Sequence, residues 1–317
     1  MTIREKKAIF EANKKIYDRA LLRFDGVEGW DVYNCSLPFT GVDGKRYIYG
    51  RVERPDEWAS SVVRLFSEVG PDHFAAVENA MIYQLEDPFL ARIHGELIMG
   101  GTHVRKTRGK IDTYYGYFYR GDETQMRYFT TGPDRMKDIR LIELHDGRIG
   151  VFSRPRHGKF EGGAQCQIGF TVIDSLDELD ADVIAGAAYL RGLIGEGEWG
   201  GVNQAYRLES GRIGVIGHMS YTDSAPDGGQ LLVYVNTAFV LDPEARTVTE
   251  PQIIGTKSCY GECAPKLPRL ADCAFTSGIV PRADGRVDLY SGVGDAGEGR
   301  ITIDNPFAGE GRIIYEL

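Results

Sequence analysis

The sequence predicts an all-β fold, a single five-bladed β-propeller with a short N-terminal helix. A unit made of an apolar strand, a glycine turn and a second apolar strand occurs five times along the 317 residues. Glycine accounts for 40 residues without a collagen period, which indicates many tight turns. Five units of about 60 residues fill the whole length, and blades arranged radially leave only short, protected sheet edges.

The five units share a glycine at the turn of a hairpin, where positive φ is needed and glycine supplies it without steric cost. Their sequences are GVDGKRYIYGRVE, ARIHGELIMGGTH, IELHDGRIGVFSRP, YRLESGRIGVIGHM and VPRADGRVDLYSGVGD, with turn glycines Gly44, Gly95, Gly147, Gly211 and Gly285. Successive intervals of 51, 52, 64 and 74 residues are typical of propeller blades with later insertions. A two-sheet sandwich is the alternative, but it does not explain a hairpin repeated at this spacing.

Residues 5–22 are predicted to form a helix, because apolar side chains recur at helical spacing among lysines and acids. A weaker helical or irregular patch covers residues 175–192. We therefore expect residues 1–24 to be a helical lead packed on the propeller, and residues 25–317 to be a single propeller domain.

The composition narrows the class of protein. A formal charge of −9 and a pI near 5.3 disfavour nucleic acid as a partner, since phosphates require a basic surface. No apolar run approaches the roughly 18 residues that cross a bilayer, and the charged N-terminus has no apolar core of a signal peptide. We expect no membrane association and a cytoplasmic location. Five irregularly spaced cysteines predict free thiols and no metal site.

An acid or an amide stands shortly before the first strand of each unit. These residues are Asp31, with Asn34 close behind it, Asp87, Asp138, Asn203 and Asp272. Because inner strands of a propeller converge, we expect these side chains to meet in a central funnel. The alternative is that each one only caps its own blade. Clustered carboxylates raise one another's pKa, and an acid-lined funnel suits sugars, whose glycosidic oxygen takes up a proton as it leaves. Asp87, held by the rigid Pro88, is the candidate general acid.

Several basic residues are predicted near the same end of the propeller. They are Arg51, Arg105, Lys137, Arg154 and, as a pocket residue, His218. They either form salt bridges with the acids or bind an anion by charge-assisted hydrogen bonds. Inverting hydrolysis needs a base to activate water, whereas phosphorolysis needs cations to hold a charged nucleophile. The combination favours inorganic phosphate as cosubstrate or product, with no further cofactor.

Three stretches resemble a known family. EDP at residues 86–88, KDIRLIELHDGRIGVFSRP at 137–155 and ADCAFTSGIV with DGRVDLYSGVGD at 271–295 are similar to the β-mannoside phosphorylases of glycoside hydrolase family 130. They are more similar still to the related mannosyltransferase-phosphorylase family, long classed as a domain of unknown function. The resemblance spans roughly residues 25–310, and its middle motif is the most specific.

The resemblance implies inverting phosphorolysis of β-linked, most often β-1,2-linked, mannose oligosaccharides, or the reverse transfer from mannose 1-phosphate. Asp87 then matches the catalytic acid, Lys137 and Arg154 the phosphate-facing cations, and Asp138 and Asp272 sugar-binding carboxylates. The chain departs from the phosphorylases in having Ser153 in place of histidine and Phe89 in place of arginine. A phosphate-independent glycosidase and a noncatalytic sugar-binding propeller stay open as alternatives, as does a homo-oligomer.

Overall fold

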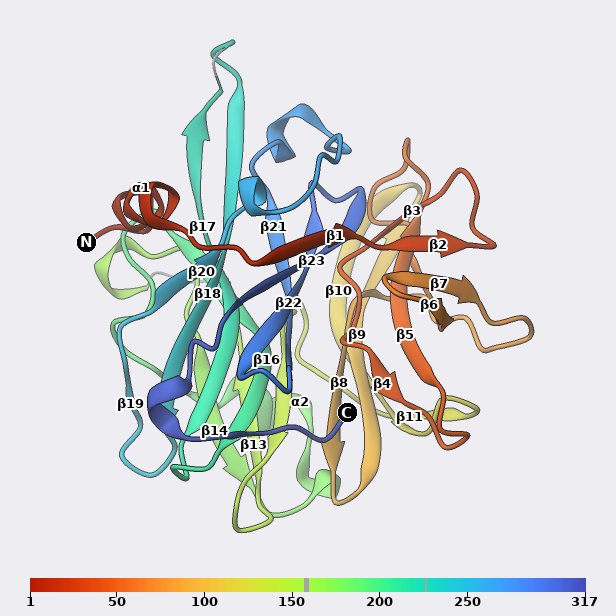
Figure 1. Cartoon of the computed structure of the whole chain (residues 1–317). Coiled ribbons are helices and arrows are strands. Elements are labelled where there is room, and N and C mark those ends of the chain that lie inside the picture. Colours follow the sequence, from red (N-terminus) through yellow and green to blue (C-terminus); the bar gives the residue numbers. More distant parts are fainter. Residues whose placement is uncertain (157–159, 226) are drawn as a thin grey trace.

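Each of the five predicted glycine turns joins the first hairpin of a separate sheet. The turn glycines have φ between 78° and 85°, the left-handed backbone that glycine adopts without steric cost. The computed structural model describes residues 1–156, 160–225 and 227–317, and in these the five sheets form the blades of a propeller (Figure 1). The predicted all-β fold with five blades is confirmed.

The blades follow one another along the chain. The first contains β2 (Arg23–Asp25), β3 (Asp31–Tyr33), β4 (Phe39–Thr40), β5 (Arg46–Glu53), β6 (Val62–Gly70) and β7 (His73–Ala76). The second contains β8 (Glu86–Ile93), β9 (Glu96–Thr107), β10 (Lys110–Gly121) and β11 (Met126–Thr131). The third contains β12 (Arg140–Glu143), β13 (Ile149–Ser153), β14 (Gly169–Ile173) and β15 (Ala188–Tyr189).

The last two blades also take in the ends of the chain. The fourth contains β16 (Trp199–Leu208), β17 (Ile213–Ser224), β18 (Gln230–Asp242), β19 (Thr247–Val248), β20 (Gln252–Gly255) and the C-terminal β24 (Ile313–Ile314). The fifth contains β21 (Ala274–Pro281), β22 (Arg286–Val293), β23 (Gly297–Asp304) and the N-terminal β1 (Asp18–Leu21). In the described part of the chain, short 3₁₀ helices join strands at Glu161–Gly163, Leu176–Glu178, Lys257–Cys259, Pro268–Leu270 and Ala308–Glu310.

The blades close into a ring. Strand β8 contacts β5 and β12, β16 contacts β12 and β21, and β3 contacts β22 and β23. Buried apolar side chains, including Ile48, Ile98, Val151, Ile216 and Leu289, fill the space between sheets. Strand β1 pairs antiparallel with β23, so a segment from the start of the chain completes the last blade. This closure holds the inner strands at fixed positions around one axis.

The N-terminal helix is shorter than predicted. Helix α1 (Ile3–Asn13) is N-capped by Thr2, whose side chain forms a capping box with Glu5. The helix lies against β17 and β20 at the side of the propeller (Figure 1). Lys14 has an extended backbone with ψ of 143°, and the chain then enters β1. The prediction of a helix over residues 5–22 was therefore wrong in its second half, because pairing with β23 overrides the local helical pattern.

The predicted helical patch at residues 175–192 contains one short α-helix. Helix α2 (Ala181–Ala185) is capped by the side chain of Asp180, which accepts from the backbone of Val183, and it ends at Gly186. The rest of the patch contains a 3₁₀ turn and β15. Among the described residues, no helix is long and apolar enough to cross a membrane.

Candidate active site

A pocket of about 350 Å³ opens at one end of the propeller and receives residues from all five blades. It is lined by Asn34, Arg51, Trp58, Ala59, Glu86, Asp87, Thr102, Val104, Ile111, Tyr114, Lys137, Arg154, Arg156, His218, Leu232, Tyr234, Arg269, Leu270, Cys273, Phe275 and Asp295. A smaller recess shares Asn34 and Asp87 with this pocket and also contacts Asn203. The convergence predicted from the sequence thus occurs for part of the expected set.

Asp87 lies at the centre of the polar part of the pocket. The pairing of β8 with β9 is interrupted between Glu86 and Phe89, and Asp87 has φ of 50°, so its side chain departs from the regular alternation of the strand. Its Oδ1 accepts hydrogen bonds from Asn34 Nδ2 at 2.8 Å and Arg51 Nη1 at 2.9 Å. Burial opposes ionisation of Asp87, but the nearby cations and the Asn34 bond outweigh it and lower its pKa.

Two more carboxyls stand beside Asp87. Glu86 Oε1 is 3.1 Å from Arg51 Nη2, and burial raises the pKa of this carboxyl despite the guanidinium. Asp295 lines the same pocket from the turn between β22 and β23, and burial raises its pKa as well. The three carboxyls therefore differ in protonation tendency, which is the condition for dividing acid and base roles within one site.

Blade three supplies the cationic side of the pocket, with Lys137 just before β12 and Arg154 just after β13. Arg154 Nη1 lies 3.2 Å from Asp138 Oδ2, and Lys137 Nζ lies 3.9 Å from Asp87 Oδ2. Burial opposes the charge of Asp138, but Arg154, Lys137 and other nearby groups hold its pKa well below the usual range. The Lys137 side chain is 25% exposed, against 6% for Arg51 and 3% for Arg154, so it is the most accessible of these three cations.

His218 is a neutral member of this group. Burial lowers its pKa to about 3. Its Nδ1 is 2.7 Å from Asn203 Oδ1, and because a carbonyl oxygen only accepts, Nδ1 donates and Nε2 is left as an acceptor. Nε2 of His218, Nδ2 of Asn203 and Oδ1 of Asn34 are buried and have no hydrogen-bond partner among the described residues. Such groups are expected to be satisfied by a bound molecule or water, and together they suit the hydroxyls of a sugar.

Three of the residues predicted for the site lie elsewhere. Asp31 is 3.7 Å from Lys266, behind the pocket lining, and Asp272 forms an ion pair at 2.7 Å with Lys7 of α1. Arg105 is 56% exposed and pairs with Asp112 on the hairpin of β9 and β10. None of the three is part of the pocket lining. The other predicted residues, Asn34, Arg51, Asp87, Lys137, Asp138, Arg154, Asn203 and His218, line the pocket or its recess or contact a residue that does.

The spacing along the chain contained a signal that separates the two groups. Asp87, Asp138 and Asn203 stand eight or nine residues before their turn glycine, whereas Asp31 and Asp272 stand 13 residues before theirs. Constant spacing places equivalent residues at equivalent heights on each inner strand. Glu86 and Asp295, which the prediction missed, are within the EDP and GVGD stretches and next to residues that were chosen.

The two departures from the phosphorylase pattern have local explanations. Phe89 is buried, and the guanidinium of Arg140 lies 4.6 Å from its ring centroid, so the aromatic side chain faces another cation here. Ser153 is buried at the end of β13 opposite Gly169 of β14, and its Oγ lies where a side chain at position 169 would be.

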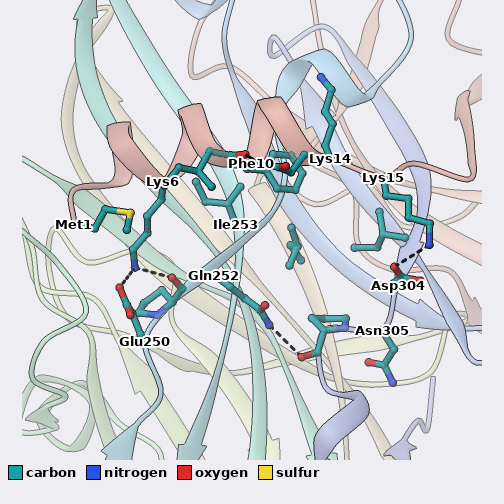
Figure 2. Close-up of a pocket in the computed structure, with 16 residues that line it drawn as sticks. Met1, Lys6, Phe10, Lys14, Lys15, Glu250, Gln252, Ile253, Asp304 and Asn305 are labelled. Atoms are coloured by element: carbon teal, nitrogen blue, oxygen red, sulfur yellow. Dashed lines mark hydrogen bonds and ion pairs between the residues drawn. The ribbon is translucent and has the colours of Figure 1, made fainter.

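A larger cavity of about 600 Å³ lies between α1 and blades four and five (Figure 2). Its charged side chains are paired: Lys6 with Glu250 at 2.7 Å, Lys15 with Asp304 at 3.8 Å, and Lys14 with Glu11 outside the lining at 2.6 Å. None of the residues predicted for the site lines it. Despite its smaller volume, the axial pocket is therefore the candidate active site.

The donors of the axial pocket suit a sugar and an anion better than a metal ion. Within residues 1–156, 160–225 and 227–317, no group of three or more His, Cys, Asp or Glu side chains is arranged to hold a metal. The five cysteines are unpaired thiols. Lys137 and Arg154 can hold an oxyanion, while carboxylates, amides and an imidazole nitrogen can bind hydroxyls.

The fold and the site together define the class of protein: a five-bladed propeller with acids and cations around its axial pocket. Residues 8–309 match the family described as Protein of unknown function (DUF1861), and the chain belongs to that family. No curated protein matches.

Solved structures extend the comparison. The chain is 57% identical to MPT-4, a mannose phosphorylase from Leishmania mexicana solved in complex with phosphate ion, with a TM-score of 0.94 and coverage of 99% and 96% of the two chains. It is 47% identical to MPT-1, a GDP-Man-dependent mannosyltransferase from the same organism, with a TM-score of 0.92 and coverage of 100% and 99%. A β-1,2-mannobiose phosphorylase from Listeria innocua, 14% identical with a TM-score of 0.61 and coverage of 87% and 91%, shares the fold. The predicted resemblance is confirmed.

Proposed function

We propose that this protein is a mannoside phosphorylase, which transfers a terminal β-linked mannose to inorganic phosphate and releases α-mannose 1-phosphate. The observation that carries the proposal is the placement of Lys137 Nζ 3.9 Å from Asp87 in a pocket that also contains Arg154. The similarity to MPT-4, a mannose phosphorylase in complex with phosphate, supports it. We take β-1,2-linked mannose oligosaccharides as the substrate to test first.

In the proposed reaction, a phosphate oxygen attacks the anomeric carbon as the glycosidic bond breaks on the opposite face. The leaving oxygen takes a proton from the Asp87 carboxyl, and uptake of a proton from solvent restores the acid. Lys137 and Arg154 hold the phosphate, while Asp138, Asn203 and His218 bind or orient hydroxyls of the transferred sugar. Bonds and charges balance without a further cofactor.

The electrostatics of the pocket make Asp87 depend on phosphate. Without a bound anion, Arg51 and Lys137 lower the pKa of Asp87, which keeps it ionised and unable to donate a proton. A phosphate beside Lys137 offsets part of that positive charge, so the pKa of Asp87 rises when the nucleophile is in place. The acid is thereby formed in the complex that uses it.

Two alternatives have observations in their favour. Glu86 and Asp295 line the pocket with Asp87 and offer a second carboxylate to activate water, as an inverting glycosidase requires. The similarity to MPT-1 favours transfer of mannose from a nucleotide sugar to an oligosaccharide acceptor. The proposed phosphorylase, when it runs in reverse, would use mannose 1-phosphate as donor.

The test is to incubate the protein with β-1,2-mannobiose with and without phosphate and to measure mannose 1-phosphate and free mannose. We expect mannose 1-phosphate only when phosphate is present. Asp87→Asn should lower turnover about a hundredfold or more, because the proton donor is lost. Asparagine tolerates the left-handed backbone that position 87 requires, so the fold should survive.

Asp112→Asn is the matched control, because Asp112 lies outside the pocket lining and pairs with the exposed Arg105. Its turnover should equal that of the wild type. Release of free mannose without phosphate would instead support the glycosidase, and turnover only with GDP-mannose would support the transferase. A folded protein without turnover in any of these assays would favour the noncatalytic sugar-binding propeller.

A further inference from the structure

The rim of the axial pocket carries an indole that the proposed chemistry does not use. Trp58 lines the pocket and is 56% exposed, whereas Trp199 is 6% exposed and Trp30 lies outside the lining. A large aromatic side chain left open to solvent beside a binding pocket is a marker of an interaction surface.

Trp58 lies on a loop between β5 and β6 that is held by hydrogen bonds. Lys106 Nζ, on β9 of the next blade, donates to the carbonyl of Trp58 at 2.9 Å and to Ser60 Oγ at 2.6 Å. The backbone nitrogen of Ser60 donates to Glu53 Oε1 at 2.8 Å. Ala59, between Trp58 and Ser60, has φ of 54°. A strained residue with hydrogen bonds on both sides indicates that the loop is held in one conformation, which fixes the place of Trp58 at the pocket.

A second apolar side chain stands at the same pocket. Ile111 on β10 is 41% exposed and lines the pocket together with Trp58. The polar residues Asp87 and Lys137 are 4% and 25% exposed, so the charged part of the pocket around Asp87 is more buried than Trp58 and Ile111. The exposed part of the lining also includes the cations Arg156 and Arg269. A pyranose ring has polar edges and an apolar C–H face, and the apolar side chains of Trp58 and Ile111 match that face.

We propose that Trp58, with Ile111, forms the platform that binds the sugar ring of the leaving oligosaccharide, next to the mannose that is transferred. This inference rests on the proposed function. The transferred mannose needs the hydroxyl-binding groups around Asp87, and the remaining chain extends toward the exposed part of the pocket. Trp58 therefore contributes to the binding of the oligosaccharide and of the acceptor in the reverse reaction, and it does not contact phosphate.

The kinetic test compares Trp58→Ala with wild type in both directions of the reaction. We expect KM for mannobiose and mannotriose, and KM for the acceptor in synthesis, to rise roughly three- to tenfold, as for loss of an aromatic contact. The KM for phosphate should not change, and Trp58→Phe should recover part of the loss. Trp30→Ala, which removes a partly exposed indole outside the pocket, should behave as wild type.

A binding measurement separates this inference from the proposed function. The chain has three tryptophans, so quenching of their fluorescence by mannose oligosaccharides can be followed without turnover. Quenching should be present in wild type and Trp30→Ala and lost in Trp58→Phe. Wild type without phosphorolysis but with this quenching would refute the proposed function and retain the platform. Unchanged oligosaccharide KM and unchanged quenching in the Trp58 variants would overturn the platform.

Discussion

Four polar residues around the axial pocket have a backbone conformation that side chains other than glycine rarely adopt. Asn34, Asp87, Asp138 and Asp295 have φ of 46°, 50°, 58° and 54°. Asparagine and aspartate tolerate this left-handed region better than bulkier residues, yet the conformation still carries strain. The hydrogen bonds and ion pairs of Asp87 and Asp138 stabilise it. At the residue scale, the site is thus defined by backbone turns that aim short polar side chains at one place.

The sequence analysis selected Asp31 and Asp272 together with Asp87, Asp138 and Asn203, although only the last three share a spacing of eight or nine residues to their turn glycine. All five stand near the start of an inner strand, and residue type alone does not show on which side of the strand a carboxylate emerges. Lys7 and Lys266 neutralise the two that lie outside the lining. Because these ion pairs join segments far apart in the chain, no local sequence pattern predicts them.

Glu298 leads to a prediction about stability and pH. Burial raises the pKa of this carboxyl to about 8, and it accepts hydrogen bonds from the backbone of Cys35 and the hydroxyl of Ser277. Between pH 4.5 and 8 the folded protein keeps a proton that the unfolded chain releases, so the stability contributed here is present below this range and is lost as pH rises through it. Glu298→Gln removes that dependence.

We expect Glu298→Gln to gain stability relative to wild type as pH rises across this window, on the order of 1 kcal/mol per pH unit. Denaturant unfolding at a series of pH values measures it. Glu310→Gln, in a 3₁₀ turn outside the pocket lining, serves as control. Parallel pH profiles for wild type and Glu298→Gln would contradict the prediction.

At the scale of elements, the N-terminal segment does two different things. Helix α1 buries Ile3 and packs Phe10 against the core, and polar contacts, among them Lys7 with Asp272, also attach it to the propeller. Strand β1 pairs with β23 along its whole length, and Asp18 forms an ion pair with Arg300 at 2.9 Å. The helical pattern was readable in the sequence, but the end of the helix was not, because it depends on the free edge of a strand almost 300 residues later.

Two truncations should therefore differ. Deleting residues 1–13 removes α1 and should lower Tm by a few degrees. Deleting residues 1–21 also removes β1 and exposes the edge of β23, so we expect a much larger fall in Tm and a tendency to aggregate. Thermal melts and light scattering compare the two proteins. Equal Tm values would show that β1 does not contribute to closing the ring.

At the scale of the whole molecule, a chain with a net charge of −9 places several cations in one pocket. Phosphate that binds only the folded state should raise Tm, with about 2.7 kcal/mol of stabilisation at a hundred times its Kd. We expect a shift of several degrees with phosphate relative to chloride at equal ionic strength. Lys137→Ala should lose most of this shift.

Arg105→Ala is the matched control for this measurement, because Arg105 is an exposed cation outside the pocket lining. It should keep the full phosphate shift. If Lys137→Ala and wild type respond equally to phosphate, Lys137 does not hold the anion, and the assignment of the cationic side of the pocket falls.

By itself, the sequence determined the number of blades and the positions of their hairpins. Turn glycines and strand alternation are local properties, and the five turns occur where Gly44, Gly95, Gly147, Gly211 and Gly285 predicted them. It also indicated that acids and cations share one end of the molecule. The tertiary structure decided which of them meet. A one-residue bulge or a single positive φ redirects a side chain, and contacts between distant strands determine where such irregularities are tolerated.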